Sequence, residues 1–305
     1  MAFTSEHFSI QEAAPGVFAL LAGTTGACVS NAAVIDLGDK TVVVDTFMTL
    51  LAGDDLFVAV RQLTGRDAFL AINSHWHDDH TGSNQLFSTG PIVSTRRTAE
   101  LIAESVSTDP TVYAEEVDEY LDWALARELE AETEEQRARA RSARMSAEAL
   151  LAGKDRFRLV LPDVFIDDRM VVRGAERDLE ILTYGGGHTE SDVFAHLPGE
   201  RIVVTGDLLW VDSHPRTNDG DPAAWAGILD RIGSLGPQTL VPGHGALGGP
   251  DHLAALADYL RHLDRVVADE GIDPETIGNL PLPSGSEDWA GGYRFADGVA
   301  ALRGR

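Results

Sequence analysis

The stretch "NSHWHDDHTGSN", residues 73–84, places three histidines and two aspartates in the six positions from His75 to His80. It directly follows the apolar run "AFLAI", which is typical of a buried strand. A tight turn has no need for imidazole, so chance is a poor explanation for this composition. Imidazole nitrogens and carboxylate oxygens are the usual protein ligands of zinc and similar divalent metals. The stretch therefore predicts a metal site at the end of a strand.

The segments around this stretch indicate an α/β fold. Residues 50–64 place Leu51, Leu56, Val60 and Leu63 at helical spacing, between two runs with strand composition. A β, α, β order favours a layered α/β architecture over an all-β one. Further strands are expected at "GVFALLAG", "ACVSNAAVIDLG", "KTVVVDTF", "RFRLVLP", "MVVRG", "DLEILTY", "VFAHL", "RIVVTGD" and "TLV", and further helices at "PAAWAGILDRIGSLG" and "DHLAALADYLRHLDRVVADEG".

A helical pair is predicted between about residues 107 and 152. Residues 113–129 carry apolar side chains at the spacing of an amphipathic helix, and Thr133 with Gln136 fits the capping-box pattern of a second helix. Three interpretations stay open, namely a solvated surface feature, a lid over the active site and a contact in a homodimer. Because loops beside a site select its substrate, this pair is also the candidate specificity element.

Three further donors follow apolar strands in the same way as the histidine stretch. His188 follows "EILTY", Asp207 ends "RIVVTGD", and His244 follows "TLVPG". Strand ends of an open α/β sheet converge on one edge, so residues distant in sequence are expected to meet there. In an extended turn His75 and His77 point to the same side, whereas Asp79 and His80 can reach a second ion. Water held between two such ions becomes a nucleophile near neutral pH.

The remaining histidines and two tryptophans are less informative. His7, His252 and His262 are interpreted as solvent-facing or helix-end residues, and His196 as structural, because it alternates with Phe194 in a strand. His214 is a candidate for the wall of a substrate pocket. Trp76, inside the histidine stretch, and Trp210, shortly after Asp207, are either further pocket walls or core residues.

Charge and composition limit the classes of partner. Lysine and arginine total 24 against 49 aspartates and glutamates, a formal charge of −25. This charge repels nucleic acids and anionic membrane surfaces, so a small-molecule substrate is expected. The single cysteine, Cys28, suits a reducing compartment. Without an apolar run of membrane-spanning length or a signal-like start, the chain is predicted to be cytoplasmic.

Taken together, these motifs resemble those of the metallo-β-lactamase fold superfamily. Its H-x-H-x-D-H motif corresponds to His75, His77, Asp79 and His80, and its later metal-binding residues correspond to His188, Asp207 and His244. The resemblance implies a single domain over residues 1–305, folded as a four-layer αβ/βα sandwich with the helical pair as an insertion. It also implies that Asp45, with Thr189, supports the metal ligands from outside.

The resemblance further implies a hydrolase with two divalent ions, zinc foremost and manganese or iron as alternatives. One ion would take His75, His77 and His188, and the other would take Asp79, His80 and His244. Asp207 would bridge the two ions, and Asp79 would orient a bridging hydroxide, so both are the implied catalytic residues. Because antibiotic-cleaving members generally lack the bridging aspartate, an ester, thioester, lactone or amide of a small substrate is expected.

Two other functions remain as alternatives. Persulfide dioxygenases on the same fold keep similar motifs but use one iron, so a mononuclear iron oxygenase is the second enzyme class. The third alternative is a non-catalytic, metal-bearing interaction protein that uses the acidic helical pair as its contact surface. A degenerate protein of that kind would be expected to have lost a ligand position, and here every position is filled.

Overall fold

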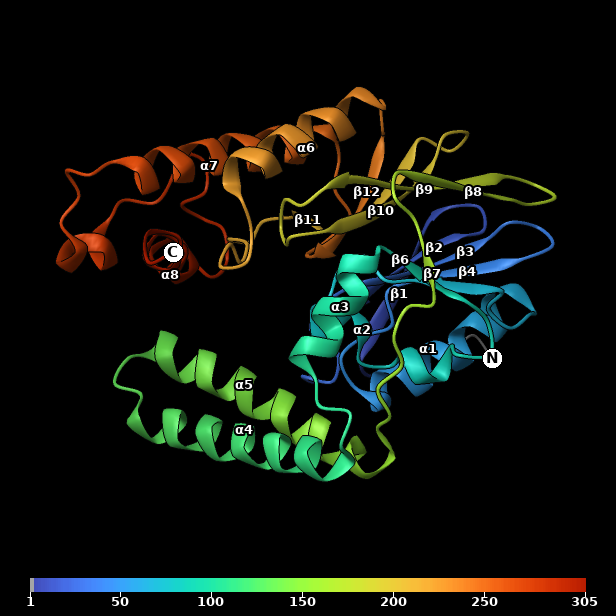
Figure 1. Ribbon diagram of the computed structural model, residues 1–305, viewed down its shortest axis with the longest axis horizontal. Helices are drawn as coiled ribbons and strands as arrows, with labels where there is room; N and C mark the ends of the chain where they lie inside the picture. Colours follow the sequence, from blue (N-terminus) through green and yellow to red (C-terminus); the bar gives the residue numbers. More distant parts are fainter. Residues whose placement is uncertain (1–2) are drawn as a thin grey trace. The chain divides into compact units, whose positions relative to one another are not determined.

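The computed structural model describes residues 3–305, and the chain divides into two compact units, Met1–Phe165 and Ile166–Arg305 (Figure 1). Each unit, called unit 1 and unit 2 below, contains its own sheet and its own helices. This mixed composition confirms the predicted α/β class. The expectation of a single domain over residues 1–305 stays a prediction. Among the described residues, no helix is long and apolar enough to cross a membrane.

The sheet of unit 1 contains seven strands in sequence order, from β1 to β7. Strands β1 to β4 pair antiparallel, and β4 to β7 pair parallel. Parallel strands point their carboxyl ends at the same edge, so the segments after β4 and β5 lie next to each other. The strands are β1 (Phe8–Ala14), β2 (Val17–Ala22), β3 (Ala32–Asp36), β4 (Thr41–Val44), β5 (Leu70–Ile72), β6 (Ile92–Ser94) and β7 (Val164–Phe165).

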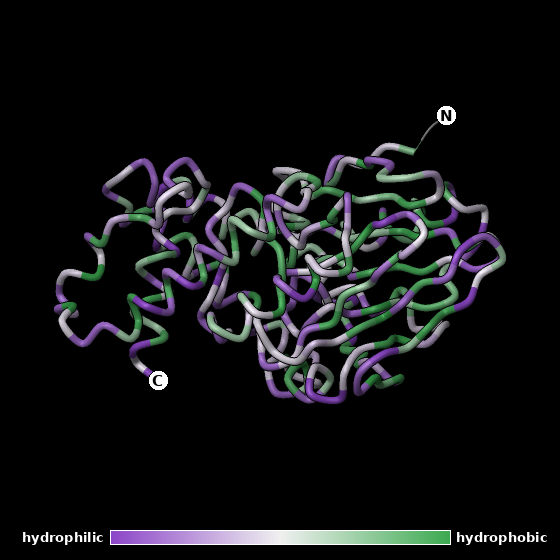
Figure 2. The backbone as a smooth tube through the Cα atoms, turned by 90° about the horizontal axis from the view of Figure 1, so that it is seen from above, coloured by the Kyte–Doolittle hydropathy of each residue, from purple (hydrophilic) through white to green (hydrophobic). Residues whose placement is uncertain are grey.

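The core of unit 1 lies between this sheet and helix α1 (Leu50–Thr64). Leu56 and Val60 of the helix pack with Val34 and Val43 of the strands, and all four are at most 1% exposed. At about 25 cal/mol per Å² of apolar surface, each such side chain contributes about 1.5–3 kcal/mol of stability. The apolar runs along the strands appear as green stretches in Figure 2. This packing holds the strand ends that carry the donors.

The predicted helical pair is present as α4 (Pro110–Glu130) and α5 (Glu134–Gly153), which lie side by side in unit 1 (Figure 1). Thr133 and Gln136 form the expected capping box at the start of α5. Arg144 contacts Glu128 of the neighbouring helix at 2.7 Å. Helix α3 (Arg96–Ser105) precedes the pair, and the short helix α2 (Asp78–Thr81) and turn η1 (Asn84–Leu86) follow β5.

Unit 2 contains a second sheet of five strands in the order β12-β11-β10-β9-β8. Strands β8 to β11 pair antiparallel, and β12 joins β11 in parallel, so the donor-bearing ends of β11 and β12 share one edge. The strands are β8 (Arg169–Arg173), β9 (Asp178–Gly185), β10 (Asp192–Leu197), β11 (Ile202–Trp210) and β12 (Thr239–His244).

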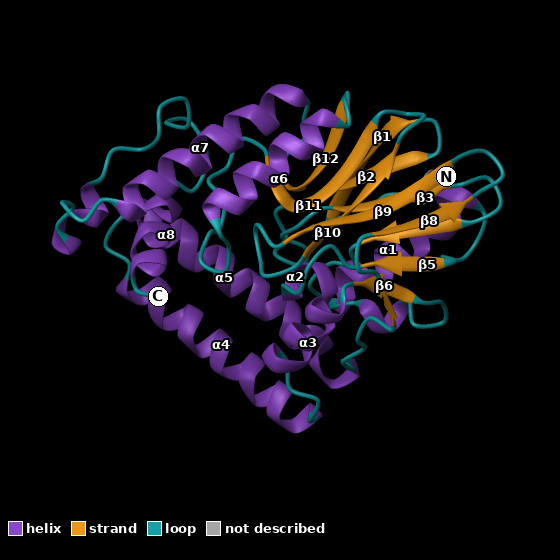
Figure 3. Ribbon diagram, turned by 45° about the horizontal axis from the view of Figure 1, so that its top comes forward, coloured by secondary structure: helices purple, strands orange, loops and turns teal. Residues whose placement is uncertain are grey.

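Helices α6 (Pro222–Ser234) and α7 (Pro250–Ala268) run side by side in unit 2 (Figure 3). Their buried faces pack with the sheet, and Trp225 of α6 is fully buried while its indole N–H donates to the Leu208 carbonyl at 2.9 Å. Turn η3 (Pro274–Asn279) and helix α8 (Tyr293–Arg303) complete the unit. The helix predicted at residues 50–64 and those predicted in unit 2 are therefore confirmed.

One strand prediction is wrong. The segment "RFRLVLP", residues 156–162, contains no strand. Its first residue ends turn η2 (Lys154–Arg156), and the rest is irregular chain. Side chains, in place of a neighbouring strand, provide hydrogen bonds to its backbone. The Gln85 amide donates to the Arg156 carbonyl, and the Asn84 amide donates to the Val160 carbonyl. Apolar composition alone does not report whether a strand partner is present.

Candidate metal centre

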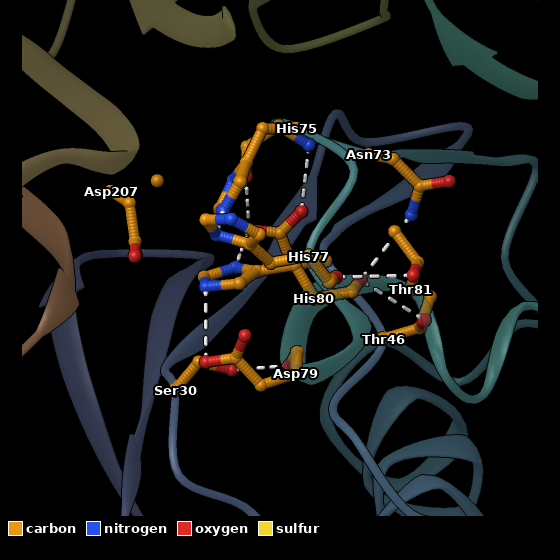
Figure 4. Close-up of polar contacts among 12 residues, drawn as sticks. Ser30, Thr46, Asn73, His75, His77, Asp79, His80, Thr81 and Asp207 are labelled. Carbon is orange, nitrogen blue, oxygen red and sulfur yellow. Dashed lines mark hydrogen bonds and ion pairs between the residues drawn. The ribbon is translucent and has the colours of Figure 1, made fainter. Parts of the chain in front are cut away.

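The histidine stretch begins where β5 ends, and its second half winds into α2. His77 is the N-cap residue of α2, and His75 Nε2 lies 2.9 Å from His77 Nδ1 (Figure 4). His75, His77 and His80 are each at most 7% exposed. Burial restricts the rings to few orientations, so the three imidazoles are held close together within unit 1.

Asp45 connects the end of β4 to the histidine stretch. Its backbone N–H donates to the Ile72 carbonyl at 2.8 Å, next to the last paired residues of the parallel β4 and β5 strands. Its φ of 62° lies in the left-handed region, which aspartate tolerates better than most residues. The carboxylate accepts from Ser74 N–H at 2.7 Å and from the Ser74 hydroxyl at 2.8 Å. Asp45 thus hydrogen-bonds to the histidine stretch within unit 1, and its predicted support of metal ligands stays a prediction.

The hydrogen bonds of Asp45 determine which histidine nitrogens are available to a metal. His80 Nδ1 lies 2.7 Å from Asp45 Oδ2, and because a carboxylate only accepts, this nitrogen donates. The lone pair of neutral His80 is therefore on Nε2, which lies 3.5 Å from Asp79 Oδ2. The Ser74 hydroxyl donates its hydrogen bond to Asp45, so its oxygen accepts a hydrogen bond from His75 Nδ1 at 2.9 Å. His75 therefore also presents Nε2 as its lone-pair nitrogen.

A buried polar network fixes the backbone of the stretch. The Asn73 and Asn84 side-chain amides exchange two hydrogen bonds, at 2.9 and 2.8 Å, and the Asn73 amide also donates to the His80 carbonyl at 3.3 Å. The Thr46 hydroxyl lies 3.0 Å from Asn84 Oδ1 and 3.3 Å from the His80 carbonyl, and Figure 4 shows the second of these contacts. Sequence reasoning missed Ser74, Asn73 and Asn84, although all three lie inside the quoted stretch. The sequence feature that could have indicated them is the presence of polar residues directly after a buried strand.

In unit 2, His188 lies in the loop between β9 and β10, and Asp192 holds this loop in shape. Asp192 Oδ2 accepts from Gly187 N–H at 2.8 Å, and Asp192 Oδ1 accepts from the Thr189 hydroxyl at 2.9 Å. Both residues flank His188, so Asp192 positions the imidazole through its neighbours. Thr189 was the predicted supporting residue, and Asp192, three positions further on, is the partner that sequence reasoning missed.

Asp207 lies beside the two candidate donor histidines of unit 2, His188 and His244. Its Oδ2 is 3.3 Å from His188 Nε2 and 3.3 Å from His244 Nε2. A register shift at Gly206, whose φ is 52°, interrupts the pairing of β11 with β12 just before Asp207. Gly243 approaches so closely that an added Cβ would lie 1.9 Å from Asp207 Oδ1. Only a residue without a side chain fits there.

The donor chemistry of both units fits divalent metal ions. Unit 1 offers the imidazoles of His75, His77 and His80 with the Asp79 carboxylate, and unit 2 offers His188, Asp207 and His244. Neutral imidazole and ionised carboxylate are the forms that bind zinc and related ions. Buried nitrogens and carboxylate oxygens within 3.5 Å of one another are an arrangement that a bound cation stabilises.

The three predicted pocket residues differ in their surroundings. Trp76 is half-buried, with its ring 4.4 Å from that of His77. Trp210 is 4% exposed and stacks on His244 at 3.8 Å between ring centroids, so it is a core residue that also supports a donor. His214 is fully buried, and its nitrogens lie 3.1 Å from the Tyr259 hydroxyl and 3.0 Å from the Ser286 carbonyl. A role for His214 as a pocket wall is therefore not supported.

Burial lowers the pKa of His214, and the Arg294 charge adds to this effect against the Ser286 hydrogen bond. The other histidines have structural contacts. His196 bonds Glu180 at 3.1 Å, in agreement with its structural interpretation, and His7 bonds Thr25 at 3.0 Å. His252 accepts from Gly249 N–H at the start of α7, which agrees with a helix-end position. None of these residues is a donor in the sets above.

The fold and the donor chemistry together define an α/β protein whose candidate metal ligands are histidines and aspartates. A sequence model of the metallo-β-lactamase superfamily matches residues 25–244, and the chain belongs to this family. The match includes every histidine and aspartate of the two donor sets. The resemblance inferred from the motifs is therefore confirmed.

Two characterised relatives match shorter segments. A metallo-β-lactamase type 2 from Bacteroides fragilis is 31% identical over 98 residues, which cover 30% of this chain and 39% of that protein. A hydroxyacylglutathione hydrolase from Fuscovulum blasticum is 36% identical over 64 residues, 21% of this chain and 25% of that protein. The chain thus matches less than half the length of either relative.

Solved structures agree with the family assignment at the level of the fold. A metallo-β-lactamase from Pontibacter korlensis superposes with a TM-score of 0.60 at 18% identity, covering 83% of this chain and 99% of that one. The DIM-1 metallo-β-lactamase gives a TM-score of 0.59 at 16% identity, covering 84% and 97%. At such identities the similarity describes the fold alone, and it confirms the predicted fold class.

Proposed function

We propose that this chain is a hydrolase that uses two divalent metal ions to cleave an ester, thioester, lactone or amide bond of a small substrate. The observation that carries the proposal is the complete set of seven donors, arranged within each unit by buried hydrogen bonds and all inside the family match. One of the two relatives is named as a hydrolase, which supports the same reaction class. The charge of −25 favours a small substrate over a polyanion.

In this proposal the two donor sets act together. By the pattern of the family, His75, His77 and His188 would hold one ion, Asp79, His80 and His244 would hold the other, and Asp207 would serve both. When bound, the ions supply Lewis acidity and lower the pKa of water enough to give a nucleophile near neutral pH. Zinc suits a donor set dominated by imidazole, and manganese or iron are the alternatives.

The remaining roles belong to the protein. Asp79 would orient a water by accepting a hydrogen bond from it. Asp45 keeps His80 in the tautomer with its lone pair on Nε2, and Ser74 does the same for His75. Asp192 holds the His188 loop so that this donor is ordered before a metal arrives. Such preorganisation lowers the conformational entropy lost on binding.

The test combines elemental analysis with a substrate panel. Protein purified without added metal is expected to contain about two equivalents of divalent metal and to hydrolyse at least one class among esters, thioesters and lactones. His77→Ala and Asp207→Ala should each lower the rate by about a hundredfold or more, because each removes a donor. His262→Ala, outside both donor sets, is the matched control and should leave the rate unchanged.

Two results would argue against the proposal. Protein that holds two equivalents of metal and cleaves nothing in the panel would exclude this reaction class. A single iron, with oxygen consumption in the presence of glutathione persulfide, would instead favour the mononuclear oxygenase. Circular dichroism of both donor variants separates a lost ligand from a lost fold.

A further inference from the structure

Unit 1 contains a cavity of about 210 Å³ beside helix α2. Asp78 and Thr81 of α2 line it, whereas Asp79 and His80, between them on the same turn, belong to the donor set. The cavity therefore adjoins the metal-binding residues along one helical turn. The predicted helical pair α4 and α5 supplies most of the opposite wall.

The walls of the cavity are mainly aromatic and aliphatic. Tyr113, Val117 and Tyr120 of α4 lie at positions i, i+4 and i+7, which form one face of the helix. The Tyr113 ring stacks on Phe157 with 4.0 Å between centroids and 18° between planes. Leu150 of α5 adds an aliphatic surface. Aromatic faces of this kind attract organic cations.

Two carboxylates add negative charge to these walls. Burial, together with the charges of Asp78 and Glu116, raises the pKa of Tyr113 to about 12, so both carboxylates act on the same hydroxyl. Within residues 3–305, Glu116 has no ion-pair partner, and nearby Lys154 contacts Asp118 instead at 2.6 Å. The cavity thus combines π faces, apolar surface and negative charge.

We propose that this cavity is a binding subsite for an organic cation with an apolar body, such as an ammonium group carried on an aryl or alkyl chain. Carboxylates and ring faces both favour positive charge and oppose an anion. Aliphatic walls select against a small hydrated inorganic cation, since they offer it no ligands. A volume of about 210 Å³ holds roughly seven water-sized groups, enough for a trimethylammonium head and part of its chain.

The position beside α2 makes this cavity a subsite for the substrate, a role that rests on the proposed hydrolytic function. An ester bearing a quaternary ammonium group would bind with its charged end against α4 and its carbonyl toward the donor-bearing turn. Binding of the cation itself needs no catalysis. The two parts can therefore be tested separately.

The binding test uses benzyltrimethylammonium, which has no lone pair for a metal, and its uncharged carbon isostere, neopentylbenzene. Calorimetry on the metal-loaded protein should show the cation binding at least about tenfold more tightly than the isostere. Glu116→Gln should weaken cation binding about three- to fivefold, as expected for an exposed charge, and Glu116→Lys should weaken it further. Glu115→Gln on the same helix, outside the cavity, is the matched control.

The catalytic test compares a choline ester with its 3,3-dimethylbutyl isostere. The cationic ester should have the higher kcat/KM, and Glu116→Gln should reduce this preference mainly through KM. Equal binding of cation and isostere, or equal effects of Glu116→Gln and Glu115→Gln, would overturn the subsite. Cation binding that depends on Glu116, without hydrolysis of either ester, would support the binding subsite and contradict its role in placing an ester for cleavage, whereas the proposed hydrolysis is judged separately on the full substrate panel.

Discussion

Replacement of Asp45 tests the claim that one buried carboxylate orders the donors of unit 1. Asp45 is 2% exposed and accepts three hydrogen bonds, two from Ser74 and one from His80. Asp45→Asn keeps the size of the side chain but turns one acceptor oxygen into a donor. Asp45→Ala removes all acceptors of this side chain and places alanine at a φ of 62°, a region that aspartate tolerates better.

The expected magnitudes follow from these contacts. A hydrogen bond to a charged group contributes about 1.5–3 kcal/mol, so Asp45→Asn should lower the free energy of unfolding by about 2–3 kcal/mol. Asp45→Ala should cost about 4–6 kcal/mol, because it leaves three buried donors unsatisfied at about 1–3 kcal/mol each. In both variants the tautomers of His80 and His75 are less restricted. Zinc affinity should therefore fall about 10- to 100-fold.

Urea unfolding of the metal-free protein measures the first effect, and competition with a chromophoric chelator measures the second. Asp122→Asn, an exposed carboxylate of helix α4 outside the donor network, is the control and should change neither quantity. If Asp45→Asn unfolds at the wild-type urea concentration and binds zinc with wild-type affinity, the orienting role assigned to Asp45 is wrong.

Three further predictions concern other residues. Gly243→Ala should lower metal affinity about tenfold or more, since its Cβ would lie 1.9 Å from Asp207 Oδ1; Gly227→Ala, with open space around it, is the control in the same chelator assay. Cys28 is 1% exposed and burial raises its pKa to about 11, so a thiol reagent at pH 8 should label only urea-unfolded protein, and rapid labelling of folded protein would contradict this burial. Burial keeps the pKa of His214 below its unfolded value of about 6.5, so below that pH the unfolded chain binds the extra proton and stability falls. His214→Asn should make urea stability decline less between pH 7 and pH 5, and an unchanged decline would refute this assignment.

The sequence predicted the elements of the fold where periodicity was strong. Helix α1 was predicted with its observed bounds, Leu50–Thr64, because apolar spacing and the flanking strands agree. The segment at residues 156–162 was mispredicted, because the apolar pattern of an irregular chain paired to Asn84 and Gln85 resembles that of a strand. Apolar patterns indicate which side chains are buried. Partners distant in sequence decide which groups form hydrogen bonds with the backbone.

The sequence by itself determined the candidate donors, since histidines and aspartates directly after apolar strands can be recognised from the sequence alone. Only the tertiary structure decided how these donors are held. The Asp45–His80 contact joins residues 35 positions apart, and Asp192 acts on His188 through two other residues. The cavity beside α2 is likewise lined by residues of α4 and α5, which are distant from that turn in the sequence. Hydrogen bonds and cavities depend on distances across the fold, and residue spacing along a chain does not contain those distances.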